Sequence, residues 1–208
     1  MFYLSKIKIR LFWVILILVF QSNFSFSAGI NTVKLLDDSE LVLNGLAKAR
    51  QDQSDYYLAA LYLTQTFQFV ASIDNDTVAK RMELKIVADS ISARRFGRYW
   101  KEAISINNEK QAWEDDVEQI IEFTKLFKGS LKKGDVIDFD YIPNKGTYVT
   151  VNNTQLGRIR GSSFFSLLLM SWIGPRPPSE SFKEGILGRN NAQTAISLQK
   201  EYQELGKK

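Results

Sequence analysis

The stretch GDVIDFDYIPNKGTYVTVNNTQLGRI at 134–159 constrains the fold more than any other part of the chain. Side chains favoured in strands alternate there between two faces, which is the period of β-structure. Residues 143–146 read Pro-Asn-Lys-Gly and form a turn, and Asn152 and Asn153 can both adopt the positive φ of a tight hairpin. The stretch therefore predicts a three-stranded antiparallel meander.

Asp138 and Asp140 lie on one face of the first predicted strand, about 7 Å apart by the strand rise. Two carboxylates at this spacing are either an acid–base couple or the solvated face of a one-sided sheet. Their neighbours on that face are Val136 and Ile142, which gives little reason for desolvation. We therefore expect a solvated face and no strongly raised pKa.

The rest of the chain predicts further strands and helices. Residues 55–65 read as a strand that is apolar on both faces and should be covered on both. Residues 81–89 alternate as a half-buried strand. Helices are predicted from Ser92 to about 104, over about 109–128, over 163–173, within 179–188 and from Asn191 onward. This order indicates an α+β fold, an antiparallel sheet with helices packed on one side.

The chain contains neither histidine nor cysteine. Nucleophile–histidine pairs and disulfides are therefore excluded, and a zinc site would have to consist of carboxylates alone. Any acid–base role falls to Asp, Glu, Lys or Tyr. We expect no metal and no cofactor.

Residues 1–27 have the pattern of a signal peptide. Lys6, Lys8 and Arg10 precede the apolar run LFWVILILVF, which is too short to span a bilayer, and we place cleavage after Ser27. The remaining chain has 24 basic and 23 acidic residues, so a nucleic-acid partner is not expected. The pattern predicts export across the inner membrane to the periplasm. An uncleaved anchor is the alternative, and the expected membrane contact is through that segment alone.

Several stretches together resemble the chalcone isomerase-like proteins of bacteria, which share their fold with plant chalcone isomerases and plant fatty-acid-binding proteins. They are LVLNG (41–45), YYLAALYL (56–63), RMELKIVADSISARRFGRYWKEAI (81–104), the meander at 131–159 and LLLMSWIGPRPPSESFKEGILG (167–188). The resemblance implies an open-faced β-sandwich, a long antiparallel sheet with a helical layer on one side and a ligand cleft between them. It implies a domain at 28–188, followed by a C-terminal helical extension at 189–208.

The same resemblance implies four candidate ligand-binding residues. In plant members an arginine before the YYLAALYL-like strand and a hydroxyl on it hold the polar end of the ligand. Tyr57 falls at the hydroxyl position, where fatty-acid binders carry tyrosine and isomerases threonine, and Arg50 is the nearest arginine upstream. Tyr99 is the phenol of the following helix, and Ser166 falls near a late hydroxyl of the plant enzyme. The other plant catalytic residues find no clear match, so no catalytic residue is assigned.

Three functions remain open at this stage. The first is an exported, non-catalytic binder of a fatty acid or similar small amphiphilic acid. The second is an isomerase or intramolecular lyase acting on a chalcone-like or other enone substrate. The third is an interaction protein of the cell envelope without a ligand pocket, which the C-terminal extension motivates.

Overall fold

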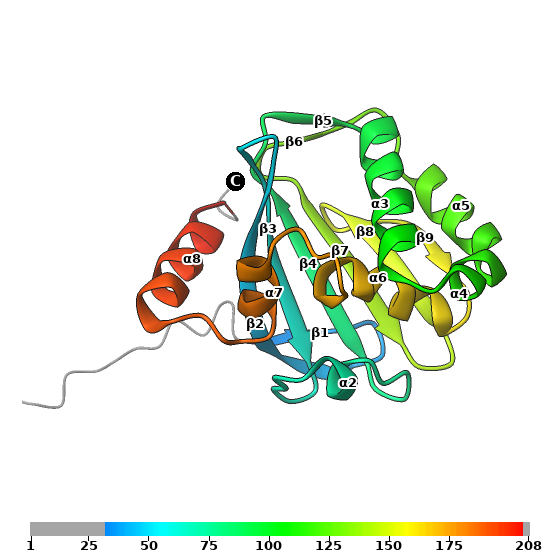
Figure 1. Cartoon of the computed structure of the whole chain (residues 1–208), viewed down its shortest axis with the longest axis horizontal. Coiled ribbons are helices and arrows are strands. Elements are labelled where there is room, and N and C mark those ends of the chain that lie inside the picture. The colour runs from blue at the N-terminus through cyan, green and yellow to red at the C-terminus, as the bar shows by residue number, and fades with distance from the viewer. Residues whose placement is uncertain (1–31, 206–208) are drawn as a thin grey trace, which may run out of the picture.

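A computed structural model describes residues 32–205, and the predicted signal peptide lies outside them. A seven-stranded antiparallel sheet dominates the molecule, with the strand order β1-β2-β3-β4-β7-β8-β9 (Figure 1). Its strands are β1 (Thr32–Lys34), β2 (Glu40–Gln51), β3 (Ser54–Leu63), β4 (Lys80–Ile86), β7 (Val136–Ile142), β8 (Gly146–Val151) and β9 (Thr154–Ile159). β5 (Ser90–Ser92) and β6 (Ser130–Lys132) form a separate two-stranded ribbon. The predicted meander is confirmed as β7-β8-β9, with positive φ at Asn144, Asn152 and Asn153.

Helices cover mainly one face of the sheet (Figure 1). They are α2 (Val70–Ile73), α3 (Ala93–Asn107), α4 (Lys110–Asp115), α5 (Val117–Leu126), α6 (Ser163–Ile173), α7 (Glu180–Ile186) and α8 (Ala192–Leu205). Ser92 caps α3 by accepting a hydrogen bond from the backbone N–H of Arg95, as its position predicts. Within residues 32–205, no helix is both long enough and apolar enough to cross a membrane.

One predicted helix is divided in the structure. The expected helix at 109–128 is broken at Asp116, which ends α4 and precedes the first residue of α5. The Asp116 backbone has φ of −103° and ψ of 18°, outside the helical range, and its side chain makes no capping hydrogen bond. The spacing of apolar residues from Trp113 to Phe127 predicted one helix, whereas the structure has two.

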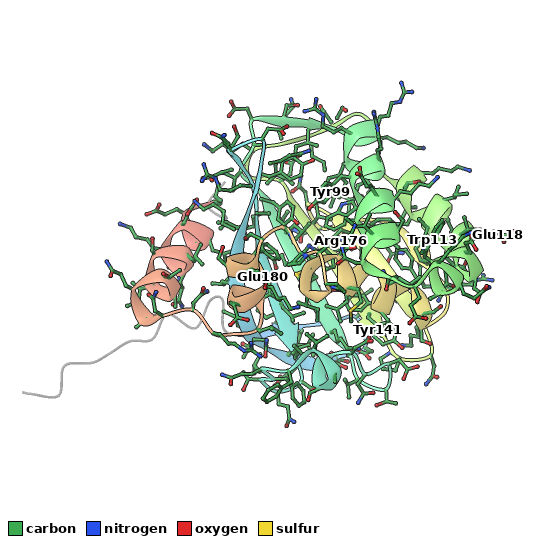
Figure 2. The ribbon with its side chains drawn as sticks, viewed as in Figure 1. Tyr99, Trp113, Glu118, Tyr141, Arg176 and Glu180 are labelled. Carbon is green, nitrogen blue, oxygen red and sulfur yellow. The ribbon has the colours of Figure 1, made fainter. Side chains whose placement is uncertain are left out.

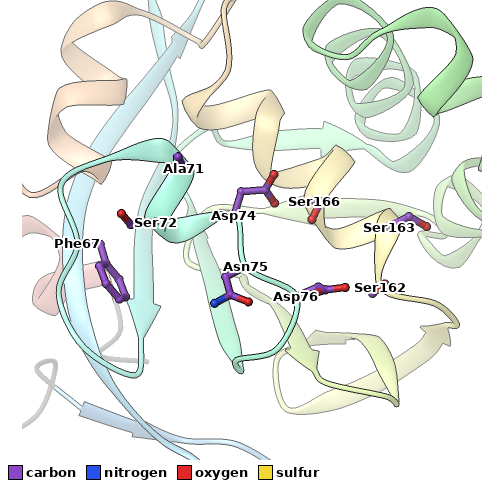
Figure 3. A pocket seen from close by; sticks show the side chains of 9 residues that line it. All are labelled: Phe67, Ala71, Ser72, Asp74, Asn75, Asp76, Ser162, Ser163 and Ser166. Carbon is purple, nitrogen blue, oxygen red and sulfur yellow. The ribbon is translucent and has the colours of Figure 1, made fainter.

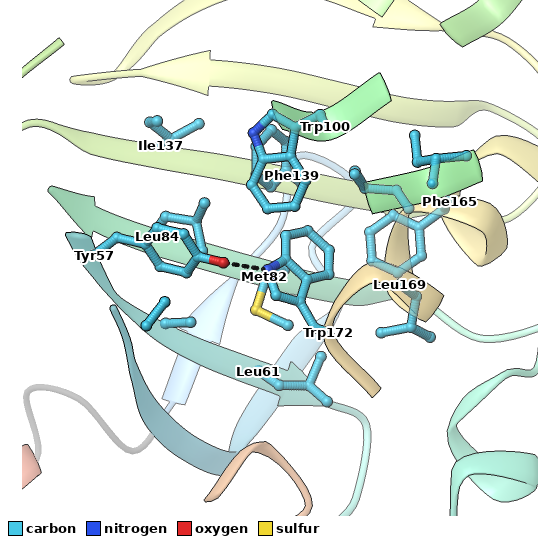
Figure 4. Close-up of a cluster of buried hydrophobic side chains, with 14 of the residues drawn as sticks. Tyr57, Leu61, Met82, Leu84, Trp100, Ile137, Phe139, Phe165, Leu169 and Trp172 are labelled. Atoms are coloured by element: carbon cyan, nitrogen blue, oxygen red, sulfur yellow. Dashed lines mark hydrogen bonds between the residues drawn. The ribbon is translucent and has the colours of Figure 1, made fainter. Parts of the chain in front are cut away.

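The main core lies between the sheet and the helices and is densely aromatic (Figure 4). The ring centroids of Trp100 on α3 and Trp172 on α6 are 4.8 Å apart, and Phe139 on β7 lies 5.9 Å from Trp172. All three side chains are fully buried. The sheet and the helices thus pack through interlocking aromatic side chains.

α8 packs on the opposite face of the sheet and closes a second, smaller core. Its Tyr202 is buried there together with Leu58 and Tyr62 of β3, so both faces of β3 are covered as predicted. Lys85 of β4 is also buried on this face, and its ammonium lies 3.8 Å from the centre of the Tyr202 ring. The strand predicted at 81–89 is confirmed over Lys80–Ile86 with its apolar face buried, but the expectation that its other face is solvated is wrong.

The predicted solvated face of the meander is also wrong. Asp138 and Asp140 are only 8% and 3% exposed. Asp140 accepts two hydrogen bonds from the guanidinium of Arg81, at 2.5 and 2.6 Å. Burial raises the pKa of Asp138 to about 7, against the lowering effect of Arg81. The prediction failed because it considered one strand alone, whereas side chains from β4 and the contact with α8 shield this face.

Candidate functional site

Three hydrogen-bonding side chains meet inside the aromatic core. Tyr57 projects from β3 into this core and is fully buried. The indole N–H of Trp172 donates to the Tyr57 hydroxyl at 3.2 Å (Figure 4), and the Tyr57 and Tyr99 hydroxyls are 3.3 Å apart. β3, α3 and α6 each contribute one member, so the cluster forms only when the sheet and the helix layer are assembled.

Burial keeps these phenols protonated. Desolvation raises the pKa of Tyr57 well above its ordinary value and also raises the pKa of Tyr99. The pKa of the neighbouring Tyr56 rises to about 12, again chiefly through burial. The Tyr56 hydroxyl is buried without a hydrogen-bond partner in the described part of the chain. The cluster therefore supplies neutral hydroxyl groups at neutral pH.

A pocket of about 280 Å³ opens beside Tyr99 and extends along α3 to the segment between α6 and α7. Figure 2 labels Tyr99 on α3 and Arg176 on that segment. The pocket is lined by Gln51, Tyr99, Glu102, Ala103, Ile106, Ser171, Arg176, Pro177 and Pro178. The hydroxyl oxygen of Ser171 is buried and has no hydrogen-bond partner among residues 32–205. We call this space the Tyr99–Arg176 pocket.

Asn107 holds the segment that carries Arg176. Its side-chain amide donates to the Arg176 carbonyl at 2.9 Å and accepts from the Arg176 backbone N–H at 2.7 Å. The same amide nitrogen donates to Ala103 within α3. The Arg176 guanidinium forms no ion pair with a carboxylate of the described chain. A fixed backbone thus presents an uncompensated positive charge at the pocket.

The structure brings together two of the four sequence candidates. Tyr57 and Tyr99 meet, as described above. Arg50 lies apart at the β2–β3 turn, where its side chain is 64% exposed, pairs with Asp55 at 3.4 Å and donates to the Gln53 carbonyl.

Ser166 lines a different hollow. This space of about 700 Å³ lies between α6 and the segment that joins β3 to β4 (Figure 3). Asp74, Asn75 and Asp76 line it opposite the serines of α6. In the described part of the chain, no group of three or more Asp or Glu side chains is arranged to hold a metal ion.

Sequence reasoning missed Ser171 and Arg176. Both lie in the stretch that carried part of the resemblance, LLLMSWIGPRPPSESFKEGILG. An arginine between two prolines is a usable signal, because the prolines restrict the backbone that presents it. Ser171 gave no such signal, since its burial beside the pocket depends on the packing of α6 against α3.

The comparisons with known proteins agree with this architecture. A family model described as chalcone isomerase-like matches residues 28–188. The crystal structure of a fatty-acid binding protein from Arabidopsis thaliana superposes with a TM-score of 0.59 and 16% identity, covering 80% of this chain and 98% of that one. A search of curated proteins found no match. The structural likeness shows the shared fold, and the family match spans most of the sequence. The chain therefore belongs to the chalcone isomerase-like family.

Proposed function

We propose that this protein is an exported, non-catalytic binder of a small amphiphilic acid, with the Tyr99–Arg176 pocket as its binding site. The observation that carries the proposal is the buried, unpartnered hydroxyl of Ser171 in the wall of a pocket that also contains Tyr99 and Arg176. A buried polar group without a partner is costly, and a ligand oxygen would satisfy it.

The polar side chains suit a carboxylate. A guanidinium pairs with a carboxylate through two parallel hydrogen bonds. Trp172 can only donate, so the Tyr57 oxygen accepts from it. Either hydroxyl of the Tyr57–Tyr99 contact can be the donor, and when Tyr57 donates, the Tyr99 proton is left for a ligand. Tyr99, Ser171 and Arg176 together offer donors to both oxygens of an acid.

The remaining wall suits an apolar tail. Ala103, Ile106, Pro177 and Pro178 supply the apolar part of the pocket lining. Each methylene group removed from water contributes about 0.8 kcal/mol. The volume is near the lower limit of ordinary ligand pockets, so a short chain or compact acid fits without rearrangement. A long acyl chain would require Trp172 or Trp100 to move.

Two observations favour binding over catalysis. The phenols are held protonated by burial, so none of them is poised as a base. Glu102 also lines the pocket, but its side chain is exposed and forms no ion pair within residues 32–205. The Arabidopsis relative is named as a fatty-acid binding protein, which fits a binder.

The first test is native mass spectrometry of residues 28–208 purified from the producing cell's own envelope, with extraction and identification of any bound acid. Titration with saturated acids of increasing chain length then gives the affinity. We expect Arg176→Ala to weaken binding at least tenfold, because a hydrogen bond to a charged group contributes about 1.5–3 kcal/mol. Ser171→Ala should weaken it less, and Glu102→Gln should strengthen it by removing a like charge.

Arg50→Ala is the matched control, since it removes an arginine that lies outside the pocket. An empty protein that also fails to bind added acids would refute the proposal. So would a loss of affinity in the Arg50 variant alone. Cyclisation of a chalcone faster than the uncatalysed reaction would refute the non-catalytic part. Export is tested separately by cell fractionation and by the mass of the mature N-terminus.

A further inference from the structure

Positive charge is concentrated in two short stretches of the sequence. Residues 90–101 and 123–134 each contain four basic residues and no acidic residue. They are Arg94, Arg95, Arg98 and Lys101 in the first stretch and Lys125, Lys128, Lys132 and Lys133 in the second. The other described residues contain 14 basic and 23 acidic side chains, a formal charge of −9. A chain that is nearly neutral overall is therefore strongly polarised.

The fold places the two stretches side by side. β5 and β6 pair through Ile91 and Leu131, and the backbone N–H of Ala93 donates to the Gly129 carbonyl. α3 packs directly against α5, and Figure 1 shows both helices next to the β5–β6 ribbon. The eight basic residues thus belong to one contiguous part of the molecule, which we call the basic face.

The basic face is open to solvent and its charges are not neutralised. All eight residues are exposed, and none forms an ion pair with a carboxylate of residues 32–205. In the sequence, the acidic residues nearest to the two stretches are Asp89, Glu102, Glu122 and Asp135, which flank them. Asp135 accepts a hydrogen bond from the Lys132 backbone and another from Asn152, so its carboxylate is engaged within the fold.

The basic face adjoins the mouth of the Tyr99–Arg176 pocket. Arg95 lies one helical turn before Tyr99 on α3, and its charge acts on the Tyr56 hydroxyl. Ile106, at the other end of the same pocket wall, is 44% exposed. A planar surface that contacts α3 from outside would therefore meet cations, an exposed apolar side chain and the pocket opening together.

We propose that the basic face docks the protein onto a membrane surface rich in anionic phospholipids. Clustered lysine and arginine side chains are attracted to anionic headgroups within a Debye length of the surface, about 8 Å at physiological salt. A membrane is favoured over other polyanions because an amphiphilic acid partitions into bilayers. This last step rests on the proposed function, and docking would bring the pocket to the source of its ligand.

The test is co-sedimentation of residues 28–208, which contain all described residues, with vesicles of phosphatidylcholine alone or mixed with phosphatidylglycerol. We expect no binding to the neutral vesicles. We expect binding that rises with the phosphatidylglycerol fraction and is lost between about 0.1 and about 0.5 M NaCl. Arg98→Glu/Lys128→Glu/Lys132→Glu should weaken binding at least tenfold.

The matched control is Lys34→Glu/Lys145→Glu/Lys200→Glu, which changes the net charge equally at exposed positions outside the basic face. It should bind anionic vesicles nearly as well as the unaltered protein, and circular dichroism checks that both triple variants are folded. Equal losses in both variants, absent binding to anionic vesicles, or preferential binding of a DNA duplex would each overturn the proposal. The readout contains no acid ligand, so failure here is distinct from failure of the binding function.

Discussion

Glu83 on β4 and Asp138 on β7 are direct partners across the sheet, so two carboxyl groups face one another on the side covered by α8. Glu83 accepts a hydrogen bond of 2.5 Å from the Tyr202 hydroxyl. The Lys85 ammonium lies 3.8 Å from the Glu83 carboxylate oxygen. Burial raises the pKa of Asp138 to about 7, and the charges of Glu83 and Asp140 add to the effect. The positive charge of Arg81 lowers the pKa of Asp138 but does not cancel this rise. Asp138 therefore holds a proton at mildly acidic pH.

Stability should fall as the pH rises from about 4 to about 7. Asp138 binds a proton more tightly in the folded protein than in the unfolded chain, whose pKa is about 3.8. Between these two values the folded state carries more protons, so raising the pH favours unfolding. One pKa unit corresponds to about 1.4 kcal/mol, so the total effect is on the order of a few kcal/mol. Urea denaturation across this range measures it.

Asp138→Asn is the variant that isolates this effect. The amide keeps the shape of the side chain and does not titrate, so the slope between pH 4 and 7 should become smaller. Glu204→Gln, which alters an exposed carboxylate of α8, is the control and should leave the slope unchanged. A slope that is the same in the Asp138 variant would show that this carboxyl group does not carry the pH dependence.

Tyr202→Phe should loosen the contact between α8 and the sheet. The substitution removes the hydroxyl that donates to Glu83 but keeps the ring over the Lys85 ammonium. Loss of a hydrogen bond to a charged group is expected to cost about 1.5–3 kcal/mol. Hydrogen exchange should show faster opening of α8 with little change in β7 and β8. Tyr148→Phe, on the edge of the same face, is the comparison and should change α8 exchange little.

Local patterns in the sequence were sufficient to predict most elements. The meander was predictable because its alternation and its turn residues are both local. α6 was predicted with its observed bounds, since Ser162 and Gly174 flank a mostly apolar run. The cap at Ser92 is equally local. Each of these features depends on residues within a few positions of one another.

The errors concern contacts between distant segments. Asp138 is buried through β4 and α8, whose relevant residues are 55 or more positions away in the sequence. The meeting of Tyr57 and Tyr99 followed from a family resemblance, since periodicity alone assigns both to the core. The burial of Ser171 beside the pocket depends on the packing of α6 against α3, which no local pattern predicts. Arg176 did carry a local signal in its two flanking prolines, but its place at the pocket also depends on that packing.

Gly45→Ala should prevent the docking of α7 on β2. A methyl group at this position would lie 2.2 Å from the Gly185 carbonyl oxygen and 2.4 Å from that of Ile186. Both obstructing atoms belong to the backbone, so a side-chain movement cannot relieve the overlap. We expect a loss of about 3 kcal/mol or more, or failure to fold. Gly129→Ala is the contrast, because open space surrounds that position and only its φ of 70° opposes the change. Thermal unfolding that is equal for the two variants would contradict the close packing.

Asn107→Ala should release the segment that carries Arg176. The side-chain amide forms two hydrogen bonds with the Arg176 backbone and a third with the Ala103 carbonyl. Its removal leaves those backbone groups unsatisfied, which we expect to cost about 2–3 kcal/mol of stability. The affinity for an acid should also fall, because the guanidinium is then held less firmly.

Asn108→Ala provides the control for this prediction. Its amide donates to the carbonyls of Ile104 and Leu167, so it links α3 to α6 without touching the Arg176 segment. Both variants should lose stability, but only Asn107→Ala should lose affinity beyond the fraction that is unfolded. Calorimetric titration below the unfolding temperature separates the two effects. Equal affinities in both variants would mean that the orientation of Arg176 does not depend on Asn107.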